Sequence, residues 1–126
     1  MHDLNLHAYE LPAVEEWLTG DDRTLAFVVS DANGDPVDIT DATVEWALYR
    51  RAYQDTPADA ILSGDDEGVE LVTDDRVDSE NGEFEVRIDG DASRSLDGEF
   101  WHRPAVTQTD DTRASWRGKV VVTASL

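Results

Sequence analysis

The chain has no cysteine, a single lysine and no long apolar run. Without cysteine there can be no disulfide, thiolate nucleophile or zinc–thiolate site, so the packed core must supply the stability. No stretch approaches the roughly 20 apolar residues of a transmembrane helix, and the N-terminus lacks the basic and then apolar layout of a signal peptide. These absences predict a soluble chain that is made in the cytoplasm.

Carboxylates dominate what is present. The 126 residues include 29 Asp and Glu against 10 Lys and Arg, a net charge of −19, whereas a magnitude of about 2–8 keeps a small domain soluble. At about 1 M salt the Debye length shrinks to ~3 Å, so the self-repulsion of such a surface is screened there and not at ordinary ionic strength. The composition predicts a protein of an extreme halophile or of a virus of one, with a mesophilic acidic domain as the alternative.

The same charge bears on the partners. An acidic surface repels nucleic acid and anionic lipid at low salt, and in concentrated salt the counterion release that drives nucleic-acid binding fades. The sequence has no basic patch that would offset this repulsion. We therefore expect neither nucleic acid nor a membrane as a partner.

Apolar and polar residues alternate with a period of two through most of the chain, as expected of half-buried strands. Turn-forming sequences, such as Asn81-Gly82, separate the runs. The runs are residues 13–18, 23–30, 43–50, 68–73, 82–89, 99–107 and 114–126. Seven or so short strands with frequent turns predict an all-β antiparallel sandwich. Residues 91–96 could add one helical turn capped by Asp91, and residues 51–60 should form a loop or irregular edge.

The first twelve residues stand apart. Leu4, Leu6 and Ala8 alternate with polar residues up to Pro12, which is a strand pattern. This strand could pair with its own sheet or with the exposed edge of a neighbour, and pairing within the chain is favoured. The expected organisation is an N-terminal arm or strand, residues 1–12, followed by one sandwich domain, residues 13–126.

The order of several motifs resembles the immunoglobulin-like domains of tailed-phage structural proteins, of the type found at the N-terminus of the baseplate upper protein. The matching segments are Asp31-Ala-Asn-Gly-Asp-Pro-Val-Asp-Ile-Thr40, Asp41-Ala-Thr-Val-Glu-Trp-Ala-Leu48, Gly82-Glu-Phe-Glu-Val86, Leu96-Asp-Gly-Glu-Phe-Trp-His102 and Gly118-Lys-Val-Val-Val122. The likeness covers roughly residues 14–126 and includes no catalytic motif. It implies an immunoglobulin-like sandwich in a virus particle.

Pro104 departs from this pattern, because it stands where the family has an apolar strand residue. Proline cannot donate a hydrogen bond to a neighbouring strand. The strand that carries it is therefore expected to be bulged or to lie at an edge.

Candidate chemical sites are weak. Asp31, Asn33 and Asp35 could hold calcium, but Ala42 stands where a calcium loop needs its distal glutamate, so a hairpin turn is the favoured interpretation. The three histidines, His2, His7 and His102, lack metal-ligand spacing, and no nucleophile elbow or phosphate-binding loop is present. His102 shares the side of its strand with Phe100 and Val106, which predicts a partly buried sheet residue. We expect no catalytic residue, metal or cofactor, and a module rather than an enzyme.

Aromatic and arginine side chains are better candidates for function, because these residue types anchor protein interfaces. Trp101 and Tyr49 fall opposite Phe100 and Leu48, so both should point away from the core. The predicted contact set is Trp17, Tyr49, Arg50, Arg51, Tyr53 and Trp101. The alternative is that the outward aromatics merely cover the second sheet face or a loop.

Together these patterns predict a structural protein of a tailed virus of a halophilic archaeon, located in the virion. Its expected partners are other virion proteins and further copies of itself. A tail or baseplate position is favoured over the head, because the best-described relative lies there. A capsid decoration or turret protein, or a receptor- or glycan-binding module on the virion surface, is the alternative.

Overall fold

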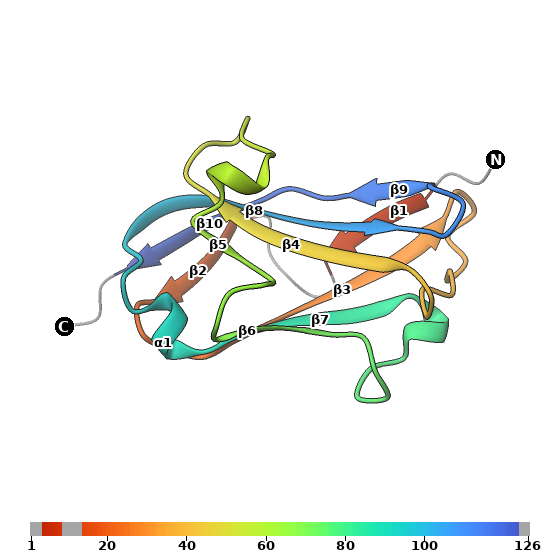
Figure 1. Ribbon diagram of the computed structural model, residues 1–126, viewed down its shortest axis with the longest axis horizontal. Coiled ribbons are helices and arrows are strands. Elements are labelled where there is room, and N and C mark those ends of the chain that lie inside the picture. The colour runs from red at the N-terminus through yellow and green to blue at the C-terminus, as the bar shows by residue number, and fades with distance from the viewer. Residues whose placement is uncertain (1–3, 9–13, 124–126) are drawn as a thin grey trace.

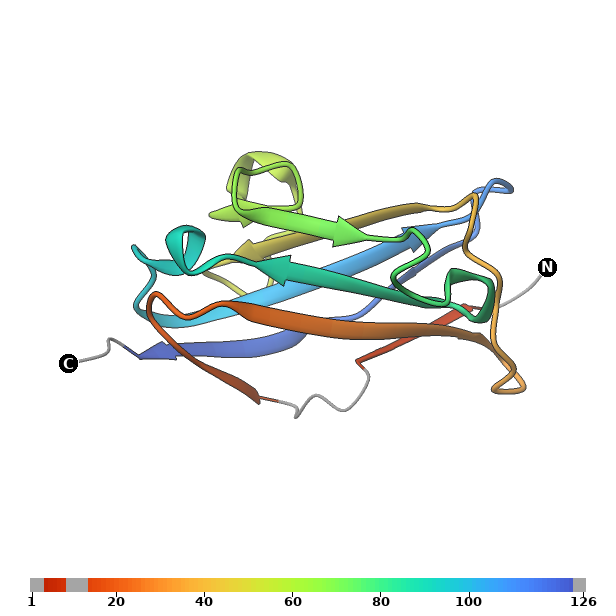
Figure 2. The same ribbon diagram turned by 90° about the horizontal axis from the view of Figure 1, so that it is seen from below.

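The computed structural model describes residues 4–8 and 14–123, which form two β-sheets packed face to face (Figures 1 and 2). The first sheet has the order β1 (Leu4–Ala8), β3 (Arg23–Asp31), β7 (Glu83–Ile88) and β6 (Val69–Val72). The second has the order β2 (Val14–Leu18), β10 (Gly118–Thr123), β8 (Gly98–Thr107), β4 (Thr43–Tyr49) and β5 (Leu62–Ser63). A further strand, β9 (Arg113–Ser115), pairs with β8 ahead of β10.

This strand order is that of an immunoglobulin-like sandwich, which confirms the predicted all-β fold class. The first strand of the domain is split between the sheets, because β1 pairs antiparallel with β3 whereas β2 pairs parallel with β10. The N-terminal segment therefore adds to the chain's own sheet. Pro12, expected to end that strand, and the predicted strand residues Ala124 and Leu126 lie outside the described residues.

The period-two pattern correctly predicted the core. Phe27, Trp46, Phe84 and Val120 point between the sheets from four different strands and are at most 2% exposed. Phe27 stacks on Phe84 within the first sheet, with ring centroids 5.1 Å apart. Val44 and Trp116 are only partly buried, although they have the same parity as the core residues of their segments. Phe27 also contacts the second sheet, with its ring centroid 6.0 Å from that of His102 and 6.1 Å from that of Trp116, so aromatic rings contribute to the packing between the sheets.

Pro104 is neither at an edge nor at a shift in register. Its strand, β8, is central in the second sheet, with Pro104 opposite Trp46 of β4. The closing strand is interrupted instead: β9 ends at Ser115, opposite Ala105, and β10 begins at Gly118, opposite His102. The Trp116 N–H still donates to the Pro104 carbonyl at 3.2 Å. Pro104, which has no N–H to donate, therefore lies opposite the break between β9 and β10. The expectation that its strand would be bulged or at an edge was wrong.

Three short helical turns complete the fold: η1 (Pro57–Asp59), η2 (Ser79–Asn81) and α1 (Gly90–Ser93). The expected cap of α1 was wrong, since Asp91 lies inside the turn and Asp89 precedes it. The carboxylate of Asp22 instead accepts a hydrogen bond from the Gly90 N–H at 2.6 Å. In the described part of the chain, no helix is long and apolar enough to cross a membrane.

Candidate functional site

The outward side of the second sheet differs from the rest of the molecule. Side chains on β2, β10, β8, β9 and β4 alternate between the core and this side, as strand geometry requires. We call part of this outward set the neutral face; it comprises Glu16, Leu18, Glu45, Ala47, Glu99, Trp101, Arg103, Ala105, Arg113, Lys119 and Val121. In Figure 1 this side is the top of the upper layer.

Charges on the neutral face balance. Three cations, Arg103, Arg113 and Lys119, stand against three carboxylates, those of Glu16, Glu45 and Glu99. Lys119 Nζ lies 2.5 Å from Glu99 Oε1, and Arg113 Nη1 lies 3.8 Å from Glu45 Oε1. The net charge of the neutral face is therefore zero, whereas the net charge of the whole chain is −19. The negative charge of the protein therefore lies elsewhere on its surface.

The neutral face also has apolar character. Trp101 and Val121 are half-buried on the neighbouring strands β8 and β10, and Ala105 is buried further along β8. Leu18 on the edge strand β2 is 49% exposed, and Tyr53 in the loop that follows β4 is 77% exposed. These two are the large hydrophobic side chains that stay exposed among the described residues; Leu18 belongs to the neutral face at its β2 edge, and Tyr53 lies on the loop beside that face. Exposed apolar patches mark protein contact surfaces, which are also enriched in aromatic residues and arginine.

A loop, residues 50–61, rises beside the neutral face (Figure 1). Its Asp55 carboxylate lies 3.6 Å from Arg103 Nη1, which ties the loop to β8. Beneath the loop is a cleft of about 290 Å³ whose lining includes Tyr49, Asp55, Ala60 and Arg103. Burial raises the pKa of the Tyr49 hydroxyl, and the nearby Arg103 opposes that shift in part.

The structure brings together only part of the predicted contact set. Tyr49 and Trp101 are directly opposite each other on β4 and β8, and both point away from the core, as parity predicted. Tyr49 is nevertheless only 5% exposed, because the loop covers it. Trp101 is thus the aromatic of this pair that can reach a partner.

The other four members of the set are scattered. Trp17 was wrongly grouped with surface residues: it is 4% exposed in the core, because it lies opposite Val122 of β10, whose side chain also points inward. The Arg50 guanidinium lies 5.3 Å from the Phe100 ring centroid, at the end of the sandwich. Arg51 and Tyr53 are exposed on the loop.

Several residues of the neutral face were not predicted from the sequence as site residues, notably Leu18, Lys119 and Val121. Their parity was available, since each alternates with a buried residue of its own strand. What the sequence did not supply was the pairing of β2 with β10, which places Leu18 beside the closing strand. A candidate surface that combines three strands far apart in sequence can be recognised only when the pairing of those strands is known.

The side chain of Asp31 forms hydrogen bonds within its own turn. Asp31 Oδ1 accepts from the N–H groups of Asn33 at 2.9 Å and of Asp35 at 3.0 Å. This arrangement is that of a hairpin turn stabilised by its first aspartate, the interpretation favoured over calcium. Throughout the described residues, no group of three or more His, Asp or Glu side chains is placed to hold a metal ion.

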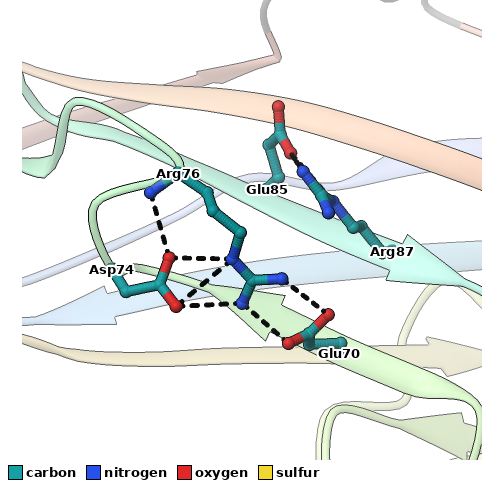
Figure 3. Close-up of polar contacts among 5 residues, drawn as sticks. All are labelled: Glu70, Asp74, Arg76, Glu85 and Arg87. Carbon is teal, nitrogen blue, oxygen red and sulfur yellow. Dashed lines mark hydrogen bonds and ion pairs between the residues drawn. The ribbon is translucent and has the colours of Figure 1, made fainter.

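The acidic surface on the opposite side is partly neutralised by arginine (Figure 3). Arg76 lies between Glu70 and Asp74, with Nη2 2.7 Å from Glu70 Oε2 and Nε 2.9 Å from Asp74 Oδ1. Hydrogen bonds from Arg76 lower the pKa of Asp74 to about 2. Arg87 pairs in the same way with Glu85 at 3.0 Å. Arg76 thus ties the loop after β6 to Glu70 on that strand, and the Glu85–Arg87 pair lies within β7.

His102 points inward as its parity indicated, but it is a core residue only 1% exposed, and so more deeply buried than the partly buried position expected. Its ring lies against those of Trp116 and Phe27, with centroids 5.2 and 6.0 Å away. The Trp46 indole N–H donates to His102 Nδ1 at 3.3 Å, so the neutral ring carries its proton on Nε2. Burial lowers the pKa of His102 to about 4. The ring has a structural role in the core.

No protein-family model and no curated protein sequence matches the chain. Solved structures match the chain over almost its full length. One is chimeric titin Z1Z2 carrying a KLER peptide from decorin, which matches at 14% identity with a TM-score of 0.52, and the match covers 99% of each of the two chains. The titin Ig tandem domains match at 8% and 0.54, and the fibronectin(III)-like modules of Clostridium thermocellum CbhA at 10% and 0.54. The chain is covered to 98% in both cases but spans only 50% and 48% of those two proteins. At such identities the likeness shows the fold alone, an immunoglobulin-like or fibronectin-like sandwich.

Proposed function

We propose that this chain is a structural protein in the particle of a tailed virus of a halophilic archaeon, where it assembles through protein–protein contacts. The observation that supports this proposal most directly is the neutral face. A protein with a charge of −19 has no need of a charge-balanced, partly apolar sheet surface for solubility. Such a surface has a physical use when another protein covers it.

The composition supports the assignment to a salt-loving host. Dense carboxylates on the remaining surface repel one another, and only concentrated salt screens that repulsion within a few Å. Protein contacts through an apolar surface gain strength in concentrated salt, whereas contacts with nucleic acid weaken. Protein–protein contacts through the neutral face are therefore suited to an assembly that forms in concentrated salt.

The tail or baseplate remains the favoured position, on the strength of the motif resemblance to baseplate domains. A glycan-binding module would use a platform of exposed aromatic rings, and the structure leaves only one ring of the predicted pair accessible. Tyr49 is buried beneath the loop, so Trp101 would have to act alone. This burial favours an assembly role over the glycan-binding alternative.

The test is the protein content of purified particles. Particles would be isolated on a density gradient in high salt from the host culture whose virus encodes this chain, and analysed by mass spectrometry with chemical crosslinking. We expect the chain at a stoichiometry comparable to that of tail proteins, with crosslinks from Lys119 to a neighbouring subunit. Its absence from particles would refute the proposed function.

A further inference from the structure

We infer that the neutral face binds a second copy of this chain, face to face about a two-fold axis. This inference rests on the proposed function in one respect, that the chain works through protein contacts, and it names the first partner. A two-fold contact is isologous, so one surface must serve both subunits. The neutral face meets that requirement, because its charges balance and it includes apolar side chains.

Charge selects the partner surface. The cations and carboxylates of the neutral face cancel, so the surplus of 19 negative charges lies outside it. If the neutral face of one copy met any other side of a second copy, it would lie against uncompensated carboxylates. When it meets its own equivalent, no surplus charge is brought into the contact. Self-association through this face is the arrangement with the least repulsion.

The neutral face also carries self-complementary charges near the start of β8. Lys119 on β10 lies beside Glu99 on the neighbouring strand β8. A two-fold axis between these side chains places each Lys119 opposite the Glu99 of the other copy. Four alternating charges then form one cluster, which is electrostatically favourable and fixes the register of the dimer.

The size of the surface indicates a weak dimer. Four strands about 4.8 Å apart, the longest with ten residues at ~3.3 Å each and the others with five to seven, present at most roughly 600 Å². A standard interface buries about 800 Å² per partner. The exposed Tyr53, on the loop beside the neutral face, can supply part of the difference. We expect a dissociation constant on the order of micromolar, strengthened in the particle by neighbouring contacts.

The experiment is sedimentation velocity of the full chain over a range of protein concentrations in about 1 M KCl, where the Debye length is ~3 Å. The test variant is Val121→Asp, which places a carboxylate on the neutral face between Glu16 of β2 and Glu99 of β8. The matched control is Val28→Asp, because Val28 is also half-buried and outward-facing, on β3 of the other sheet. Circular dichroism would verify that both variants are folded.

We expect the unmodified chain and Val28→Asp to dimerise equally, and Val121→Asp to dimerise at least about tenfold more weakly, since a carboxylate buried without a partner is strongly unfavourable. Lys119→Glu should weaken the dimer, and the charge swap Lys119→Glu with Glu99→Lys should restore it. A monomer at every concentration, or equal dissociation of the two Asp variants, would overturn the inference.

The outcome is separable from that of the proposed function. A chain found in virus particles but monomeric in solution and uncrosslinked to itself would refute self-association and leave the structural role intact. A chain that dimerises as described but is absent from particles would refute the role and leave the dimer.

Discussion

Acidification should destabilise this protein through one buried histidine, His102. In the folded chain the ring is neutral, and burial lowers its pKa from 6.5 to about 4. In the unfolded chain the ring is in water and titrates near 6.5. Between these two values the unfolded state binds more protons than the folded state, so stability must fall as pH falls through this window.

The magnitude follows from the difference between the two pKa values. Each pKa unit is worth about 1.4 kcal/mol, so a drop from 6.5 to about 4 corresponds to roughly 3 kcal/mol. This conversion is justified because the side chain is only 1% exposed. A loss of this size is a large part of the ~5–15 kcal/mol that stabilises a typical domain.

The assay is urea unfolding followed by tryptophan fluorescence, at pH values from 6.5 to 4 in constant high salt. The control is His102→Asn, whose amide oxygen can accept the hydrogen bond from Trp46 but whose side chain does not titrate. Carboxylates also protonate in this range, and they do so in both proteins. The difference between the two pH profiles therefore isolates the histidine.

We expect the unmodified protein to lose roughly 3 kcal/mol more than His102→Asn over this interval, with the difference levelling off below about pH 4. A direct nuclear magnetic resonance titration of the His102 ring should show a midpoint near 4. Parallel pH profiles, or a ring that titrates near 6.5 in the folded state, would refute the reasoning.

Three further predictions concern the core, an exposed ion pair and the salt requirement. Gly118→Ala should lower the free energy of unfolding by about 1–3 kcal/mol, because the added methyl would collide with the Trp116 ring and lie 2.8 Å from His102 Nε2; an unchanged urea midpoint would contradict this packing. Arg76→Gln should raise the pKa of Asp74 from about 2 toward 3.8, as measured by carboxyl resonances, whereas a carboxyl that still titrates near 2 would mean that Arg76 is not the cause. Raising KCl from about 0.1 M to about 1 M should raise the melting temperature, because the Debye length falls from ~10 Å to ~3 Å, and equal melting temperatures would argue against adaptation to salt.

Much of the fold was predictable because strand geometry is local. The alternation around Phe27 and around Phe84 correctly predicted which side chains enter the core, since successive residues of a strand point to opposite faces. The cap of α1 was not predictable in this way. It comes from Asp22, which lies 68 residues away from Gly90 in the sequence.

The candidate site was less predictable than the fold. Parity correctly directed Tyr49 and Trp101 away from the core, but parity says nothing about what lies above the sheet. The loop that covers Tyr49 is attached by the contact between Asp55 and Arg103, two residues far apart in sequence. Trp17 was misassigned because the strand that contains it is short and its parallel partner, β10, is the last strand of the chain.

The order of residues thus specifies the strands, their inward faces and the acidic character of the surface, because periodicity and composition act locally or as sums over the chain. The tertiary structure alone decides which outward faces become neighbours. Lys119, Glu99 and Leu18 form one charge-balanced surface only when β10 lies between β2 and β8. That juxtaposition depends on pairing between distant segments, and an alternating pattern carries no information about pairing partners.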